Sequence, residues 1–166
     1  MSAHLWVSWD DYHRHIEQLA RIVHDSGYPF DRVLCLARGG LRIGDVFSRV
    51  FKTPLHILST SSYREAAGTL QGELSIAEHI TSTDGPLAGR VLLIDDLVDS
   101  GVTLERVRAH LGERFPSVTE VRSAVIWCKG CSLMRPDYYV EYLPDNPWIH
   151  QPFEVYDEMT VDRLVG

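Results

Sequence analysis

The stretch VLLIDDLVDSGVTL, residues 91–104, constrains the fold of this chain more than any other segment. Four apolar residues come directly before Asp95 and Asp96, and Asp99 follows three positions later. The apolar run is typical of a strand that is buried on both faces of a parallel sheet, and the small residues after Asp99 indicate a turn into a helix. Ligands of such sheets bind beyond the carboxyl ends of the strands, so we expect a site at this turn.

The remaining segments alternate between strand-like and helix-like patterns. Predicted strands are short apolar runs, and they cover residues 32–37, 54–60, 90–95, 118–127 and 138–143. Predicted helices have apolar residues at helical spacing, and they lie between a Ser8 cap and Gly27, at 41–51 and at 101–114. A chain of 166 residues suits one domain. We therefore predict an α/β fold, a parallel twisted sheet with helices on both faces, in a single domain covering residues 1–166.

Residues 62–89 differ from the rest of the chain because they are polar and rich in glycine, with only short apolar pieces. A segment of this length without clear structure inside a compact domain is usually functional. We predict a partly mobile loop that closes over the site and orders when the ligand binds.

Composition limits the classes of partner. The net charge is -7, and lysine and arginine are scattered, whereas a nucleic-acid groove or an anionic membrane needs a basic stripe. No apolar run is long enough to span a bilayer, and the amino terminus does not read as a signal peptide. Three cysteines do not make a disulfide framework. We predict a cytoplasmic protein with small-molecule partners and no nucleic-acid or membrane partner.

The turn from Asp99 to Thr103 offers small residues, two hydroxyls and the backbone amides of a helix start, which together suit a phosphate. Helix capping by Asp99 or Ser100 is the simpler alternative, but it leaves Asp95 and Asp96 unexplained. Sugar hydroxyls donate hydrogen bonds to carboxylates, and Mg²⁺ binds carboxylates together with phosphates. Phosphate, sugar diol and metal together describe a phosphorylated ribose.

The order Asp95-Asp96-Leu97-Val98-Asp99-Ser100-Gly101-Val102-Thr103 resembles the signature of the type I phosphoribosyltransferases, which bind 5-phosphoribosyl-1-pyrophosphate (PRPP). Ser100 stands where threonine is commoner, and Val102 where glycine or lysine is often found. Residues 37–41, 61–63 and 148–154 resemble further segments of the 6-oxopurine branch, especially the bacterial xanthine-guanine and hypoxanthine-guanine enzymes.

The resemblance implies a role for each residue of the signature. Asp99 would be the catalytic residue, relaying a proton near N7 of the base. Asp95 and Asp96 would orient the ribose hydroxyls, with Asp96 also a ligand of the cofactor Mg²⁺. The 5′-phosphate would be held by the residues of the turn, which are Ser100, Gly101, Val102 and Thr103.

The pyrophosphate group would be bound by two loops, whose residues are Arg38, Gly39, Ser62 and Tyr63. In this family the peptide bond before the basic residue, here Ala37–Arg38, is often cis. Glycine lets the backbone approach an anion, and arginine supplies donors that match phosphate oxygens. Without the resemblance, an ordinary turn carrying an exposed arginine would be the simpler interpretation.

The purine base would meet three further residues. Lys129 would face O6, which favours a 6-oxopurine over adenine, and Trp148 would stack on the ring beside Ile149. The alternatives are a solvated surface lysine and an ordinary core tryptophan. His150 replaces the acid that is usual in the bacterial relatives, which leaves the choice between guanine and xanthine open.

The motif Cys128-Lys129-Gly130-Cys131 also permits a redox pair or half of a zinc site. No second pair of cysteine or histidine ligands accompanies it, and Pro136 soon ends any helix that would activate a thiol. We favour neither role.

The implied reaction is transfer of 5-phosphoribose from PRPP to N9 of hypoxanthine, guanine or xanthine, in purine salvage. The resemblance also implies a small hood formed by residues 143–166 with the amino-terminal segment, and a homodimer or homotetramer. Two alternatives keep the fold: a PRPP-sensing regulator that binds nucleic acid, which the acidic composition disfavours, and an enzyme that acts on another base.

Overall fold

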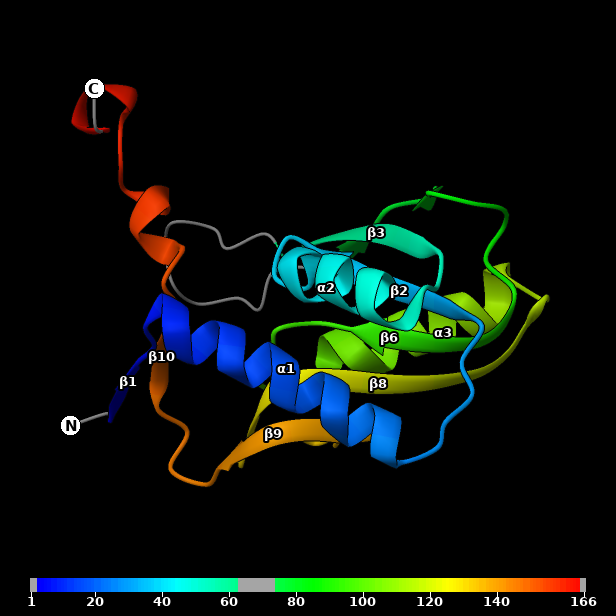
Figure 1. Cartoon of the computed structure of the whole chain (residues 1–166), viewed down its shortest axis with the longest axis horizontal. Coiled ribbons are helices and arrows are strands. Elements are labelled where there is room, and N and C mark those ends of the chain that lie inside the picture. The colour runs from blue at the N-terminus through cyan, green and yellow to red at the C-terminus, as the bar shows by residue number, and fades with distance from the viewer. Residues whose placement is uncertain (1–2, 63–73, 165–166) are drawn as a thin grey trace.

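The computed structural model describes residues 3–62 and 74–164, which form a large sheet with helices on both faces and a small second sheet (Figure 1). The strands of the large sheet run in the order β4-β3-β2-β6-β8-β7, with β9 also paired to β8 and β5 to β3. Its five main strands are mutually parallel, and they are β2 (Arg32–Ala37), β3 (Leu55–Ser62), β6 (Gly89–Ile94), β8 (Val118–Lys129) and β9 (Tyr138–Leu143). Their carboxyl ends therefore lie at one edge of the sheet, where a ligand site is expected.

Helices cover both faces of this sheet, because its strands are apolar at successive positions. Val33 and Cys35 pack into one buried cluster with α1 (Trp9–Asp25) and α2 (Leu41–Phe51), whereas Leu34 and Leu36 pack into a second cluster with α3 (Val102–Arg114). Figure 1 shows α1 and α2 on the near side of the sheet and α3 behind it. The predicted α/β class is confirmed.

Several local predictions are also confirmed. β2 and α2 have the predicted bounds, α3 begins at Val102, and β8 extends two residues beyond the predicted end at Trp127. Ser8 caps α1, since its Oγ accepts a hydrogen bond of 3.1 Å from the backbone N–H of Asp11.

The second sheet was not predicted as strands. It pairs β1 (His4–Trp6) with β10 (Trp148–His150) in parallel, so His4 lies opposite Trp148 and Trp6 opposite His150. Strands of three residues have too few positions to show the alternation by which a longer strand is recognised. The pairing joins the amino-terminal segment to residues 148–150 beside the carboxyl ends of the main strands (Figure 1). Both paired segments belong to the predicted hood.

The predicted loop at 62–89 is only partly described. Two short strands, β4 (Leu74–Ile76) and β5 (Thr81–Ser82), pair antiparallel with β3, and Leu87 is buried beneath them in the second cluster. Residues 63–73 lie outside the described residues. The mobility of this loop and the single-domain boundary stay predictions.

A short strand, β7 (Leu97–Val98), continues past the end of β6 and pairs in parallel with β8. After β10 the chain forms two single 3₁₀ turns, η1 (Glu154–Asp157) and η2 (Val161–Arg163), which lead away from the sheet in Figure 1. Over the described ranges, no helix has the length and apolar character needed to cross a membrane.

Candidate active site

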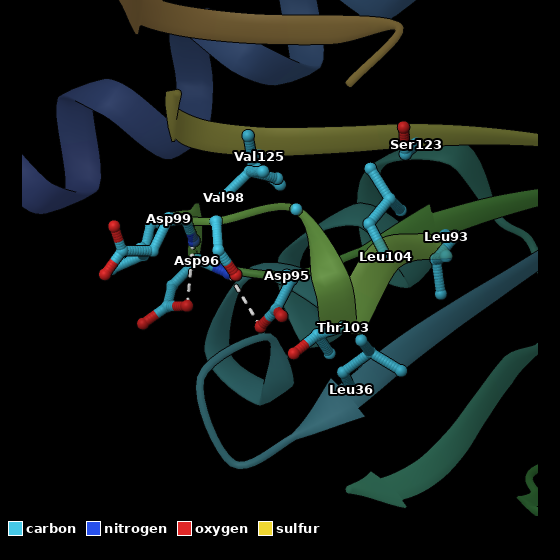
Figure 2. A pocket seen from close by; sticks show the side chains of 13 residues that line it. Leu36, Leu93, Asp95, Asp96, Val98, Asp99, Thr103, Leu104, Ser123 and Val125 are labelled. Atoms are coloured by element: carbon cyan, nitrogen blue, oxygen red, sulfur yellow. Dashed lines mark hydrogen bonds between the residues drawn. The ribbon is translucent and has the colours of Figure 1, made fainter. Parts of the chain in front are cut away.

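The end of β6 forms an acidic tip, which consists of Asp95 and Asp96. Backbone hydrogen bonds fix this tip to β8. The N–H of Asp95 donates to the carbonyl of Ala124 at 3.2 Å, and the N–H of Ile126 donates to the carbonyl of Asp96 at 2.9 Å. The N–H of Asp96 donates to Asp95 Oδ1 at 2.9 Å, as Figure 2 shows. Burial and the neighbouring charge of Asp96 raise the pKa of Asp95 well above its ordinary value. A cation or a hydroxyl donor would relieve the repulsion between these carboxylates.

The turn after the tip leads into α3 through Gly101, whose φ is 87°. A Cβ at Gly101 would lie 2.8 Å from the backbone nitrogen of Met134, so the close approach of that loop requires glycine. Gly101 is itself the cap residue, and no side-chain cap bond is present there in the described chain. Apart from a weak 3.4 Å bond from Val102 N–H to Ser100 Oγ, the first amides of α3 are available to a ligand. Asp99 does not act as the cap.

Two cavities meet at Asp96. The first has a volume of about 190 Å³ and is lined on its polar side by the tip and the turn, through Asp95, Asp96, Asp99, Ser100, Gly101 and Thr103. The second has a volume of about 880 Å³, and its lining includes Arg38, Gly39, Asp96, Gln151, Glu154 and Asp157. Val102 does not line either cavity as the described residues form them. The larger volume lies in the range that holds small-molecule ligands.

The loop between β2 and α2 brings two of the four predicted pyrophosphate residues, Arg38 and Gly39, to the second cavity. The Ala37–Arg38 peptide bond is cis, as the resemblance implies. A Cβ at Gly39 would lie only 2.6 Å from Cγ of Asp96, so this glycine allows the loop to contact the acidic tip. The side chain of Arg38 is exposed, and its Nη2 lies 3.6 Å from Oδ1 of Asp157. The backbone of Ser62 ends β3, and Tyr63 lies outside the described residues.

Asp99 is contacted by two residues of the Cys128–Cys131 motif. Nζ of Lys129 lies 3.4 Å from Asp99 Oδ2, and the lysine side chain is only 11% exposed, so it is not a solvated surface lysine. Sγ of Cys131 lies 3.4 Å from Asp99 Oδ1, while Cys128 is buried. Desolvation by the neighbouring atoms and the hydrogen bond to Asp99 raise the pKa of the Cys131 thiol, which makes it a poor nucleophile at neutral pH.

The predicted base-stacking residues lie on β10. Ile149 is buried in the first hydrophobic cluster, and Trp148 is half-exposed. Neither lines the two cavities as far as the structure describes them, so their roles stay predictions. His150 stacks on Trp6 with centroids 3.7 Å apart and also contacts His4. His150, which stands where the bacterial relatives usually have an acid, therefore contacts β1.

Comparison with known proteins decides the family. Residues 8–158 match the family model described as the phosphoribosyl transferase domain. The chain belongs to the phosphoribosyltransferase family.

Solved structures agree with this assignment. A purine phosphoribosyltransferase from Pyrococcus horikoshii is 27% identical, covering 90% of this chain and 93% of that one, with a TM-score of 0.74. The Helicobacter pylori xanthine-guanine-hypoxanthine phosphoribosyltransferase is 24% identical over 93% and 96% of the two chains, with a TM-score of 0.75. A hypothetical protein from Neisseria gonorrhoeae with bound ppGpp is 23% identical over 98% and 93%, with a TM-score of 0.71. The last two, which are less than 25% identical, show the fold alone. Together with the family match, the comparisons confirm the predicted resemblance to type I purine phosphoribosyltransferases.

Sequence reasoning missed two residues of this phosphoribosyltransferase site. Nε2 of Gln151 donates to Asp96 Oδ2 at 2.5 Å. The guanidinium of Arg42 lies 4.4 Å from the ring centroid of Phe153, and both residues line the larger cavity. Gln151 belongs to the 148–154 segment that resembles the family, but nothing in the sequence indicates that its side chain reaches the tip of β6.

The carboxylate oxygens at the acidic tip are ligand atoms that suit a magnesium ion. No group of three or more histidine, cysteine, aspartate or glutamate side chains that suits a metal is present among the described residues. Mg²⁺ usually binds through one or two carboxylates together with substrate phosphates, and Asp95 and Asp96 offer such carboxylates. The phosphoribosyltransferase site therefore suits a Mg²⁺ ion that binds together with a phosphorylated substrate.

Proposed function

We propose that this phosphoribosyltransferase transfers 5-phosphoribose from PRPP to N9 of a 6-oxopurine in cytoplasmic purine salvage. The products are a nucleoside monophosphate and pyrophosphate, and the acceptor is hypoxanthine, guanine or xanthine. One observation carries the proposal: an acidic tip and an amide-rich turn open into two cavities that share Asp96. This arrangement suits a ligand with a phosphate, a diol and a pyrophosphate group.

Each part of PRPP has a matching part of the site. The amides of α3 and the hydroxyls of Ser100 and Thr103 bind the 5′-phosphate, because a helix start favours anions. Asp95 and Asp96 accept hydrogen bonds from the ribose hydroxyls. Arg38 and the backbone of Gly39 bind the pyrophosphate in the larger cavity.

The transfer step develops positive charge on the ribose ring as the bond to pyrophosphate lengthens. Asp96 would hold a Mg²⁺ ion there, and the chemistry that the ion would supply is neutralisation of the departing pyrophosphate. Asp99 relays the proton that leaves the base, and a positioned acid–base group contributes about 10²–10⁴-fold in rate. Because Lys129 and Cys131 contact its two oxygens, Asp99 is held in one orientation.

Specificity for 6-oxopurines rests on Lys129. Its ammonium donates to a carbonyl oxygen at position 6, whereas the 6-amino group of adenine is itself a donor. An unsatisfied contact of this kind costs about 1–3 kcal/mol, which corresponds to about fivefold to 150-fold in preference.

A panel of bases tests the proposal. Hypoxanthine, guanine, xanthine, adenine and uracil are each incubated with the purified protein, PRPP and Mg²⁺, and pyrophosphate release is followed. We expect release with at least one 6-oxopurine and at least about fivefold less with adenine. Equal turnover of adenine and guanine refutes the specificity. If none of the bases causes pyrophosphate release and the protein binds RNA or DNA in a gel-shift assay, the result favours a regulator.

A further inference from the structure

Gln151 connects two parts of the molecule that are far apart in sequence. It follows β10 directly, and its side chain reaches back to the tip of β6, where Nε2 donates to Asp96 Oδ2 at 2.5 Å. The other carboxylate oxygen, Oδ1, accepts from the N–H of Leu97 at 2.8 Å. Each oxygen of Asp96 therefore has one donor from the protein, and the remaining lone pairs are available to a ligand.

The carbonyl oxygen of the Gln151 amide has no hydrogen-bond partner among the residues that the structure describes. The side chain is 6% exposed, and its Oε1 makes no hydrogen bond with the described residues. A buried acceptor without a donor costs about 1–3 kcal/mol, so a glutamine here is not explained by packing. Gln151 lines the larger cavity together with Asp96, which indicates that a bound ligand supplies the missing donor.

The contact also determines where Asp96 lies. The Asp96 carboxylate is held between the Gly39 loop, where a Cβ would lie 2.6 Å from Cγ, and the amide of Gln151. The chain after Gln151 provides Phe153, Glu154 and Asp157 to the same cavity. The side-chain amide of Gln151 thus links the acidic tip to the segment after β10, which lines the same cavity.

We infer that Gln151 is a positioning residue for Asp96 and that its Oε1 accepts a hydrogen bond from an O–H group of the bound donor substrate. This role rests on the proposed function, because it needs PRPP as the ligand. Two groups have the right chemistry, a ribose hydroxyl and a water molecule on a bound Mg²⁺ ion. Both are O–H donors, and the presence or absence of the metal distinguishes them.

The test compares Gln151→Met with the wild-type protein by calorimetric titration of PRPP, with Mg²⁺ and with EDTA. Methionine has nearly the same shape but neither a donor nor a strong acceptor. We expect Kd for PRPP to rise about tenfold to 100-fold, the value of one or two hydrogen bonds that involve a charged group. A rise in both buffers assigns the bond to a ribose hydroxyl, and a rise with Mg²⁺ alone assigns it to metal-bound water.

Gln18→Met, on the exposed side of α1, is the matched control, and its Kd for PRPP should not change. A purely structural role for Gln151 predicts a lower melting temperature with an unchanged Kd, and that result overturns the inference. Failure of the wild-type protein to bind PRPP refutes the proposed function instead.

The wild-type protein gives a second readout that does not depend on the variant folding. The side-chain amide protons of Gln151 should shift and exchange more slowly in NMR spectra when PRPP is added. Resonances that do not move at saturating PRPP contradict the assigned contact.

Discussion

Substitution of Gly39 by alanine should displace the carboxyl group of Asp96 while changing the stability of the fold only slightly. The new Cβ would lie 2.6 Å from Asp96 Cγ, and an ordinary contact needs at least 3.4 Å, so the carboxyl group must retreat by about 0.8 Å. The displaced group is the end of a side chain beside a cavity, so we expect a loss of only about 1 kcal/mol of stability. A misplacement near 1 Å in a catalytic site costs about 100-fold in rate, and we expect that loss in kcat/KM for PRPP.

Gly40→Ala is the matched control because its Cβ would meet backbone instead. The nearest atoms are the carbonyl oxygens of Ile94 at 2.5 Å and Leu36 at 2.9 Å, which belong to the central strands. Overpacking of this kind costs about 1–3 kcal/mol, or about 2–12 °C in melting temperature for a chain of this size. Melting curves and pyrophosphate-release kinetics are measured on both variants. A Gly39→Ala protein that melts normally and keeps wild-type kcat/KM refutes the role given to the position of Asp96.

Three further variants test other parts of the site and the fold. Asp99→Asn should lower kcat by about 10²–10⁴-fold while PRPP still binds by calorimetry; wild-type turnover removes Asp99 from the mechanism. Lys129→Met should reduce the preference for guanine over adenine by about tenfold or more in a competition assay, and an unchanged ratio contradicts the O6 contact. Hydrogen bonds from Arg90 lower the pKa of Asp31 to about 2, so the pair stabilises the fold above pH 4 and this contribution disappears as the pH falls toward 2. The melting temperature of Asp31→Asn should therefore be below wild type at pH 7, with a gap that narrows on acidification; a gap independent of pH counts against the pair.

The sequence predicts the central sheet well because local patterns determine it. The runs at 33–37 and 91–94 are apolar at successive positions, which is typical of a strand covered on both faces. The turn that is predicted to bind phosphate is equally local, since Ser100, Gly101 and Thr103 lie within one turn of chain. Residue type and spacing predict a turn that suits a phosphate, and the resemblance implies the role of each residue.

Contacts between distant segments could not be predicted in the same way. The bond from Gln151 to Asp96 joins residues 55 positions apart, and it depends on the paths of β6 and β10, not on a periodic pattern. The β1–β10 pair joins residues 4–6 to residues 148–150 through strands of three residues, which are too short to show alternation. The contact between Cys131 and Asp99 likewise depends on the loop that packs on Gly101.

The central claim is that the acidic tip and the adjoining turn bind PRPP together with Mg²⁺. Isothermal titration of the purified protein with PRPP in magnesium buffer tests it most directly. The account predicts saturable binding, at least tenfold weaker when EDTA replaces the metal. Absence of binding heat in both buffers, across several temperatures and at high protein concentration, contradicts it.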